Sequence, residues 1–255
     1  IFPDSTIQFL QNGGNYYAAV ETLFTPEQAN EQRRIVKKMT EENGSVEFDE
    51  NGKAQYTGDV KQDKRVDIVV GLPASGKSTL AEALSAMYKG RMLDSDDAKK
   101  YHKDYQDGDN SSPLHNESRF ITDQAQVIMM AKGDNVVLPV VGHSYNSVLR
   151  QIQDFKNAGY TVHLHDVQLP WNNALSRAMN RTLETNRLLN FGYLTGTDAT
   201  GLTPQKINDT FDRLIKEGYA DGYAVWNNDV ERGKPPIPVS YSYGGEIGIT
   251  TGARS

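Results

Sequence analysis

The sequence of 255 residues contains no cysteine, and this absence removes several kinds of chemistry from consideration. Without thiols there is no disulfide framework, no zinc site built on thiolates and no cysteine nucleophile. Long hydrophobic runs are also missing, because the longest nearly apolar stretch covers only residues 136–142. A helix that crosses a bilayer needs about 20 apolar residues, so the sequence predicts no membrane contact of that kind.

The chain also lacks an excess of positive charge, since 27 Lys and Arg residues stand against 33 Asp and Glu residues, for a net charge of −6. This balance argues against a broad surface that neutralises nucleic-acid phosphates. No repeat or low-complexity tract is present, which excludes solenoids. The chain begins with Ile1 instead of Met, and no signal-peptide pattern precedes the first helix. We therefore expect an excised or processed piece of a protein.

Residues 1–62 predict a small helical and hairpin appendage. Thr25 is followed by a proline, which is typical of a helix start, and apolar residues recur at helical spacing through residues 26–42. An Asn-Gly pair then ends this helix. Residues 45–62 are polar and contain a second Asn-Gly pair at 51–52, so they predict a hairpin or linker.

Residues 63–230 predict alternating strands and helices. The strands are expected over residues 66–70, 91–94, 135–141, 161–169 and 223–227, and the helices over 78–88, 117–132, 145–158, 172–185 and 203–217. Apolar strands separated by helices of this length are typical of a parallel sheet covered on both faces. Residues 231–255 lack a periodic apolar face, and we expect them to be extended or ordered only against another surface.

A phosphate-binding loop follows the first strand of this region. Residues 71–78 match the pattern G-x-x-x-x-G-K-[ST] without mismatch and lie between a strand and a helix, as the pattern requires. We expect Lys77 to neutralise the β- and γ-phosphates of ATP and the Ser78 hydroxyl to bind Mg²⁺. The residues predicted to bind the nucleotide are Gly71, Leu72, Pro73, Ala74, Ser75, Gly76, Lys77, Ser78 and Thr79.

An acidic segment, Asp94-Ser95-Asp96, follows about twenty residues later, at the carboxyl end of the next strand. Strand ends at this edge of an open α/β sheet line the ligand crevice. A carboxylate there can accept the proton of a hydroxyl as the γ-phosphoryl group is transferred. These residues predict a kinase. The alternative is an acidic loop that only caps a helix through Ser95 or Asp96.

Together, the phosphate loop, the Asp-x-Asp-x-x-Lys segment, the strand over residues 136–141 and a later arginine-bearing helix resemble the zeta-toxin family of small-molecule P-loop kinases. The likeness covers roughly residues 66–227. It implies a three-layer α/β/α sandwich that phosphorylates a sugar hydroxyl of UDP-N-acetylglucosamine. It also implies Asp96 as general base, with Asp94 and Lys99 on the substrate side. The same acidic segment is similar to that of 5′-polynucleotide kinases, whose catalytic aspartate also falls on Asp96.

The chain departs from the zeta-toxin pattern at residues 138–144, which read Leu-Pro-Val-Val-Gly-His-Ser where the family commonly has a glutamate. The acceptor is therefore left open between a UDP-sugar and NAD. We predict that His143 and Ser144 contact the substrate, although Ser144 also fits an N-cap of the helix after it. The segment after Lys99 adds rings and cations for a nucleotide, namely Tyr101, His102, Lys103 and Tyr105.

Arginines on the predicted helix over residues 172–185 suit a lid over the phosphates. Arg177 and Arg181 are four residues apart and share a face, and Arg187 follows the helix. Guanidinium groups would stabilise the negative charge that spreads during transfer. The alternative is a solvated face with Glu184 as partner. The resemblance implies Arg181 as a lid arginine, and Arg187 is the candidate for a second one.

Two histidines, His163 and His165, lie two apart on a predicted strand, but no third metal ligand is evident, and we interpret them as packing residues.

The favoured function is an ATP- and Mg²⁺-dependent kinase that acts on a hydroxyl of a nucleotide-sugar or dinucleotide. The alternatives are a 5′-hydroxyl polynucleotide kinase and a nucleotide-gated binding module without catalysis. The resemblance also implies an inhibitory, antitoxin-like partner, for which the helix over residues 26–42 is a candidate in cis. We expect a cytoplasmic protein or a delivered effector.

Overall fold

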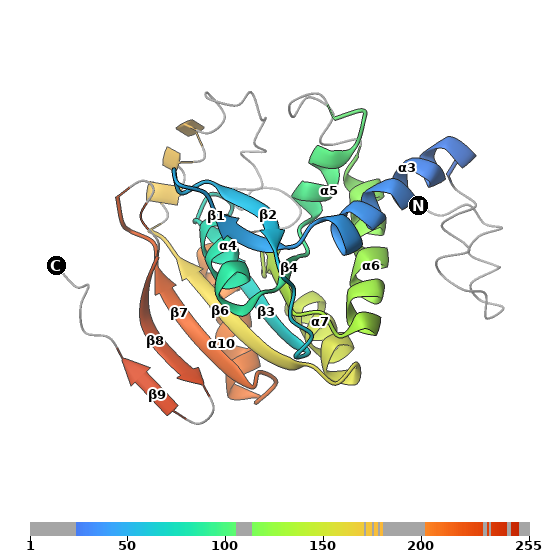
Figure 1. Ribbon diagram of the computed structural model, residues 1–255. Coiled ribbons are helices and arrows are strands. Elements are labelled where there is room, and N and C mark those ends of the chain that lie inside the picture. Colours follow the sequence, from blue (N-terminus) through green and yellow to red (C-terminus); the bar gives the residue numbers. More distant parts are fainter. Residues whose placement is uncertain are drawn as a thin grey trace.

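The computed structural model describes residues 24–105, 114–170, 202–231, 234, 236–243 and 246–249, together with 172–174, 176, 177, 179 and 180. Its centre is a seven-stranded sheet with the order β4-β5-β3-β6-β7-β8-β9 (Figure 1). The parallel strands are β3 (Arg65–Gly71), β4 (Arg91–Met92), β5 (Val136–Val140), β6 (Thr161–Gln168) and β7 (Gly222–Asn227). The predicted parallel sheet is therefore confirmed.

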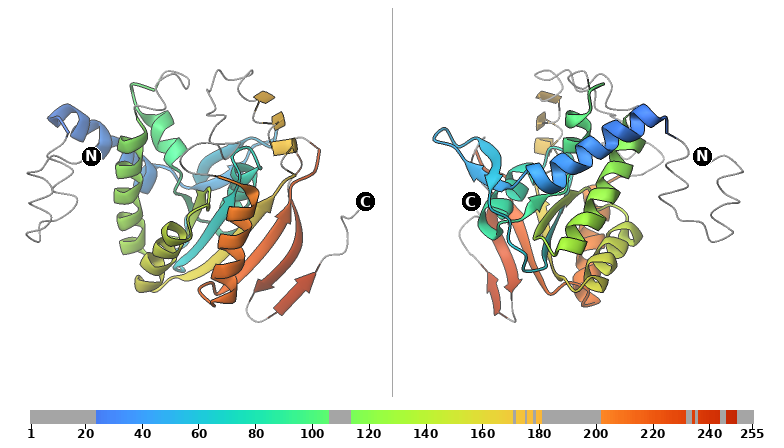
Figure 2. Two further views of the ribbon diagram at one scale, coloured as in Figure 1. Left: turned by 180° about the vertical axis from the view of Figure 1, so that it is seen from behind. Right: turned by 45° about the vertical axis from the view of Figure 1, so that its right-hand side comes forward.

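Helices cover both faces of this sheet, as the continuous apolar strands predict. Helices α6 (His115–Lys132), α7 (Tyr145–Asn157) and α10 (Pro204–Lys216) lie on one face (Figure 2). Their apolar side chains share a core with Ile68 and Val70 of β3. Helix α4 (Lys77–Tyr88) lies on the other face and packs on Val69 of the same strand. Helices on both faces of the central sheet give the protein its three-layer α/β/α arrangement.

A hairpin of β1 (Ser45–Phe48) and β2 (Ala54–Gly58) packs beside α4, with Val46 and Tyr56 in the same apolar cluster. Helix α3 (Pro26–Lys37) precedes it and continues as a π-helical turn, η1 (Lys38–Glu42). A capping box between Thr25 and Gln28 starts α3, since each side chain accepts the other's backbone N–H. The predicted helix and hairpin are thus confirmed.

Neither piece of the predicted appendage is separate from the core. Ile35, Val36 and Met39, which come from α3 and η1, belong to the same apolar cluster as β3, α6 and α7. Two described parts of the tail join the sheet, because β8 (Ile237–Tyr243) pairs antiparallel with β7, and β9 (Glu246–Ile249) pairs with β8. Backbone hydrogen bonds therefore hold residues 237–243 against β7 and residues 246–249 against β8. The division of the chain after residues 62 and 230 stays a sequence prediction.

Strand order decides where a ligand can bind. The chain leaves β3 for the edge at β4, returns to β5 beside β3, and then crosses to β6 on the other side of β3. The carboxyl end of β3 is therefore the point at which the direction of winding reverses, and ligands bind there in open α/β sheets. Within the described residues, no helix combines the length and apolar character that crossing a bilayer requires.

Candidate active site

The phosphate loop leaves β3 at Gly71 and enters α4 at Lys77. Ala74 and Gly76 both have positive φ angles, of 62° and 95°, which fold the backbone tightly between strand and helix. Glycine adopts this conformation freely, whereas alanine does so at a cost of about 1–3 kcal/mol. The loop thus holds strain at Ala74, as binding sites often do. Ser78 and Thr79 lie exposed in the first turn of α4.

Lys77 bends back across this loop. Its ammonium donates to the carbonyl oxygens of Gly71 at 2.9 Å and Leu72 at 2.7 Å. These bonds keep the charge beside the positive end of α4, where an anion is attracted both by the ammonium and by the free N–H groups of the helix start. The role of Lys77 on the phosphates stays a prediction.

The loop fits a phosphate chain by its packing. A Cβ atom on Gly71 would lie 2.7 Å from Ser75 Oγ and 2.9 Å from the Val167 carbonyl, and one on Gly76 would lie 1.9 Å from the side-chain nitrogen of Asn228. Side chains at either glycine would therefore displace the loop. Ser75 is fully buried, and its hydroxyl has no hydrogen-bond partner among the described residues. At these two glycines the backbone, and not a side chain, is left to face a ligand.

Asn228 is the residue of this site that the sequence analysis missed. It follows β7 and lies against the phosphate loop. The general rule that strand ends line the crevice would have pointed to it, since β7 is one of the predicted parallel strands. No local pattern distinguishes it from its neighbour Asn227.

The acidic segment after β4 forms the start of a short helix, α5 (Ser95–Tyr101). Asp94 is its N-cap, and its Oδ1 accepts the N–H of Asp96 at 2.9 Å. The alternative interpretation gave this role to Ser95 or Asp96, and the structure corrects that assignment. Because Asp94 caps the helix, the carboxylate of Asp96 is not needed as the cap.

Asp96 is the more accessible of the two aspartates. Its side chain is 36% exposed, and its Oδ1 lies 3.5 Å from the ammonium of Lys99, which is only 11% exposed. The two side chains thus form an ion pair within one turn of α5. Asp96 is therefore a carboxylate at a strand end that can face an incoming hydroxyl, as the sequence predicts. Its role as general base stays a prediction.

Asp94 lies in an acidic environment. Burial, together with the neighbouring charges of Asp97 and Asp96, raises the pKa of Asp94 to about 6. Burial and the charge of Asp97 also raise the pKa of Glu82 on α4. Asp97 itself is buried and accepts a hydrogen bond from the Tyr56 hydroxyl at 3.0 Å. The hairpin thus supplies a donor to the acidic segment, which nothing in the sequence indicated.

At the end of β5, Gly142 has a φ of 82° and is followed by His143 and Ser144. Ser144 is the N-cap of α7, since its hydroxyl accepts the N–H of Ser147 at 3.4 Å. This observation confirms the capping interpretation. His143 is half-buried at the carboxyl edge of the sheet. Contact of either residue with a substrate stays a prediction.

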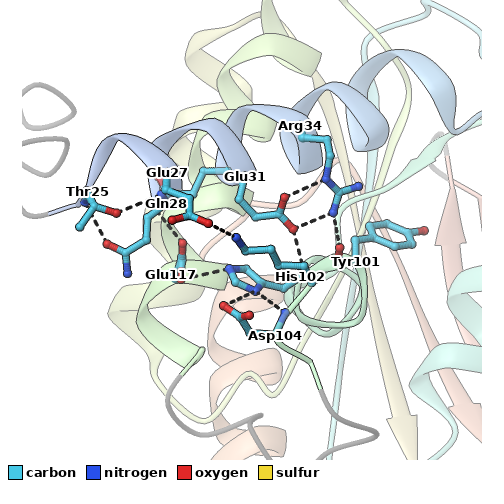
Figure 3. A network of polar contacts seen from close by, with 11 residues as sticks. Thr25, Glu27, Gln28, Glu31, Arg34, Tyr101, His102, Asp104 and Glu117 are labelled. Carbon is cyan, nitrogen blue, oxygen red and sulfur yellow. Dashed lines mark hydrogen bonds and ion pairs between the residues drawn. The ribbon is translucent and has the colours of Figure 1, made fainter.

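The segment after Lys99 is engaged by α3 (Figure 3). Tyr101 accepts a hydrogen bond from Asn43 on its hydroxyl, and its carbonyl accepts one from Arg34 at 2.5 Å. His102 is 6% exposed and lies 3.3 Å from the Glu117 carboxylate of α6. The burial of His102 corrects the expectation that it is open to a substrate, whereas contact of the half-buried Tyr101 with a substrate stays a prediction. Lys103 pairs with Glu27 of α3 at 2.6 Å.

Of the three predicted lid arginines, the structure describes Arg177. Its guanidinium donates to the carbonyl oxygens of Asn228 at 3.1 Å and Val230 at 3.0 Å. Arg181 and Arg187 lie outside the described residues, so their roles stay predictions. Arg177 thus connects the predicted lid helix with the segment that follows β7.

The donor set near the loop also suits Mg²⁺. The exposed hydroxyl of Ser78 is available beside the phosphate loop. Within the described residues, no group of three His, Cys, Asp or Glu side chains could hold a metal ion. Mg²⁺ keeps several waters and is bound through substrate phosphates with one or two protein ligands, so it needs no such group.

Comparisons with known proteins agree with this geometry. The family model described as zeta toxin matches residues 50–225. No curated protein matches the chain. Among solved structures, the PezAT chromosomal toxin–antitoxin system of the human pathogen Streptococcus pneumoniae is similar, with 12% identity, a TM-score of 0.60 and coverage of 84% of this chain and 80% of that chain.

Two structures of the AvrRxo1-ORF1:AvrRxo1-ORF2 complex are also similar. The native complex shows 17% identity and a TM-score of 0.61, and covers 89% of this chain and 70% of that chain. The complex with ATP shows 19% identity and a TM-score of 0.53, with 88% and 66% covered. At these identities the likeness establishes the fold, and the match to the family model over more than half of the chain establishes the family. The chain therefore belongs to the zeta toxin family and is a P-loop kinase.

Proposed function

We propose that this protein binds ATP with Mg²⁺ and transfers the γ-phosphoryl group to a hydroxyl of a nucleotide-sugar or dinucleotide, with Asp96 as general base. The observation that carries the proposal is the arrangement at one edge of the sheet. The phosphate loop ends β3, and the Asp94–Asp96 segment follows β4. The similar AvrRxo1 complex solved with ATP supports ATP as the donor.

In the proposed reaction, Asp96 accepts the proton of the acceptor hydroxyl as the hydroxyl oxygen forms a bond to the γ-phosphorus. The bond between that phosphorus and the bridging oxygen of ADP breaks in the same step, and ADP leaves. Lys77 and the start of α4 hold the β- and γ-phosphates in line with the hydroxyl. Bound Mg²⁺ would neutralise charge on these phosphates, held on the protein side by Ser78.

Arginines would complete the charge stabilisation. Arg181, and Arg187 as a second candidate, would donate to the oxygens of the γ-phosphoryl group as negative charge spreads over them. Arg177 was predicted to share this role. Its bonds to the carbonyls of Asn228 and Val230 favour a part in holding the lid helix instead.

The acceptor side is formed by Asp94, Lys99, His143 and Ser144. These residues follow two adjacent strands, β4 and β5, and they combine a cation with an imidazole ring. Such groups suit a phosphate-bearing ligand better than a free sugar. The absent family glutamate in residues 138–144 leaves the choice between UDP-sugars and NAD open.

We further propose a protein partner of the antitoxin kind, because the PezAT structure is described as a toxin–antitoxin system and AvrRxo1-ORF1 was solved in complex with a second chain. The helix over residues 26–42 stays a candidate for that place in cis. Helix α3 packs on α6 and contributes Ile35 and Val36 to the core, and its Arg34 donates to the carbonyl oxygen of Tyr101 in α5.

The proposal is tested by incubating the protein with Mg²⁺ and γ-labelled ATP, together with UDP-sugars, NAD and 5′-hydroxyl oligonucleotides in separate reactions. We expect label on a sugar or ribose hydroxyl of a UDP-sugar or of NAD. Lys77→Ala is the control, and it should abolish turnover while the protein stays folded.

Other outcomes have defined meanings. Label only at the 5′ end of the oligonucleotide would favour the polynucleotide kinase. ATP binding without transfer to any acceptor would favour the nucleotide-gated binding module. If folded Lys77→Ala binds ATP as tightly as the parent protein, the assignment of the phosphate loop is wrong.

A further inference from the structure

Asn228 lies directly against the phosphate loop although it is 153 positions away in the chain. The residue is 4% exposed, and its Nδ2 donates to the carbonyl oxygen of Ser75 at 2.6 Å. The same side chain occupies the space beside Gly76, where a Cβ atom would come within 1.9 Å of Nδ2. The contact is therefore buried, polar and closely packed.

The backbone of Asn228 is fixed from two other elements. Its N–H donates to the carbonyl of Gln168, at the end of β6, at 2.9 Å. Its carbonyl accepts from the guanidinium of Arg177, which also bonds to Val230. The backbone of Asn228 is thus held by the sheet and by the predicted lid helix, and its side chain extends from this fixed backbone to the phosphate loop.

The hydrogen bond to Ser75 sets the direction of one backbone N–H group. A trans peptide is planar, with its carbonyl oxygen and the following N–H on opposite sides. Because the Ser75 carbonyl is held toward Asn228, the N–H of Gly76 is directed away from it. Phosphate loops bind their anion through such N–H groups. Without this hydrogen bond, the peptide plane between Ser75 and Gly76 could rotate easily, because Gly76 has no side chain to restrict it.

We infer that Asn228 is a positioning residue for nucleotide binding, which aims the Gly76 N–H at the phosphates and ties the loop to the lid helix through Arg177. This inference rests on the proposed function. Packing alone would need only a side chain of similar volume at this position. The Asn228 amide instead donates a hydrogen bond to the Ser75 carbonyl at 2.6 Å, which an apolar side chain of similar volume could not do.

The test compares two isosteric substitutions at adjacent positions. Asn228→Asp removes the donor and places a carboxylate against the Ser75 carbonyl. Asn227→Asp adds the same charge one residue away, and it retains the oxygen that accepts the N–H of Asp229 at 2.8 Å. Asn228→Leu removes the donor without adding charge. ATP affinity is measured by calorimetry with Mg²⁺, and the fold of each variant is checked by circular dichroism and thermal melting.

We expect Asn228→Asp and Asn228→Leu to weaken ATP binding by about tenfold or more, which is the size of a lost hydrogen-bond partner. Asn227→Asp should stay within about twofold of the parent protein, because salt and water screen a charge at the surface. In kinetics, the KM for ATP should rise while the KM for the acceptor does not change. A residue that acted only on stability would lower the melting temperature and leave ATP affinity of the folded protein unchanged.

Two results would overturn the inference in distinguishable ways. A parent protein that does not bind ATP would overturn the proposed function and the inference with it. Normal ATP affinity in folded Asn228→Asp would overturn the inference alone. If Asn228→Leu does not fold, Asn228→Asp carries the test, because it keeps the size and shape of the native side chain.

Discussion

The Tyr56 hydroxyl donates a hydrogen bond to the Asp97 carboxylate at 3.0 Å, and this contact joins the β1–β2 hairpin to α5, the helix that carries the proposed base Asp96. Asp97 is buried, and the ammonium of the exposed Lys100 lies 3.3 Å from its Oδ1. Burial and the charge of Asp97 raise the pKa of Tyr56 far above its ordinary range, so the hydroxyl stays a donor. The hairpin therefore supports the acidic segment directly.

Removing that hydroxyl should destabilise the protein. We expect Tyr56→Phe to lower the free energy of unfolding by about 1–2 kcal/mol, because a buried carboxylate loses its neutral donor. Urea unfolding followed by circular dichroism measures the change. Tyr145→Phe is the matched control, since the Tyr145 hydroxyl bonds Glu217 in an exposed position, and the loss there should stay below about 0.5 kcal/mol. Equal effects of the two substitutions would contradict the prediction.

The pKa of Asp94 predicts how stability depends on pH. In the folded protein this pKa is raised to about 6 from 3.8, so between these values the folded state keeps a proton that the unfolded state loses. The contribution of Asp94 to the free energy of unfolding is therefore fully present below about pH 4, and it is lost as the pH rises through about 6. Asn cannot ionise and is an equally good N-cap.

Asp94→Asn should consequently be more stable than the parent protein at pH 7, by about 1–2 kcal/mol, and nearly equal to it at pH 4. Denaturant unfolding at several pH values measures the difference between the two proteins. A difference that does not vary between pH 4 and pH 7 would show that Asp94 ionises normally in the folded state.

The choice of general base is tested by rates. We expect Asp96→Asn to bind ATP normally and to lower kcat by about 10²–10⁴-fold, because a lost general base affects proton transfer and leaves the phosphate loop intact. Turnover with the labelled acceptor and calorimetry with ATP provide the two measurements. If Asp94→Asn is the inactive variant and Asp96→Asn is nearly normal, the base is Asp94.

Two arginines of the predicted lid helix should behave differently. Arg181→Ala should lower kcat by about 10²–10³-fold with little change in ATP affinity, since its charge acts on the transition state. Arg177→Ala should mainly weaken ATP binding and lower the melting temperature, because its guanidinium holds the carbonyls of Asn228 and Val230. A rise in the KM for ATP with unchanged kcat in Arg181→Ala would instead make Arg181 a clamp on bound ATP.

Features that depend on residues close to one another in the chain could be predicted from the sequence. The phosphate loop is one contiguous segment between a strand and a helix, and its bounds agree with β3 and α4. The N-cap residues Thr25 and Ser144 act within the first turn of their own helices. Helix α5 and strands β8 and β9 were not predicted, because the first is only seven residues long and the others have no apolar periodicity.

By itself, the sequence determined the class of chemistry, since the residues of a phosphate loop must be consecutive for their N–H groups to converge on one anion. Only the tertiary structure decided which distant residues support that loop. Asn228 reaches Ser75 across 153 positions, and buried His165 meets Asp67 across 98, at 2.8 Å. Such contacts follow from strand order and register, which are set by packing the whole sheet against its helices, and no local spacing encodes them.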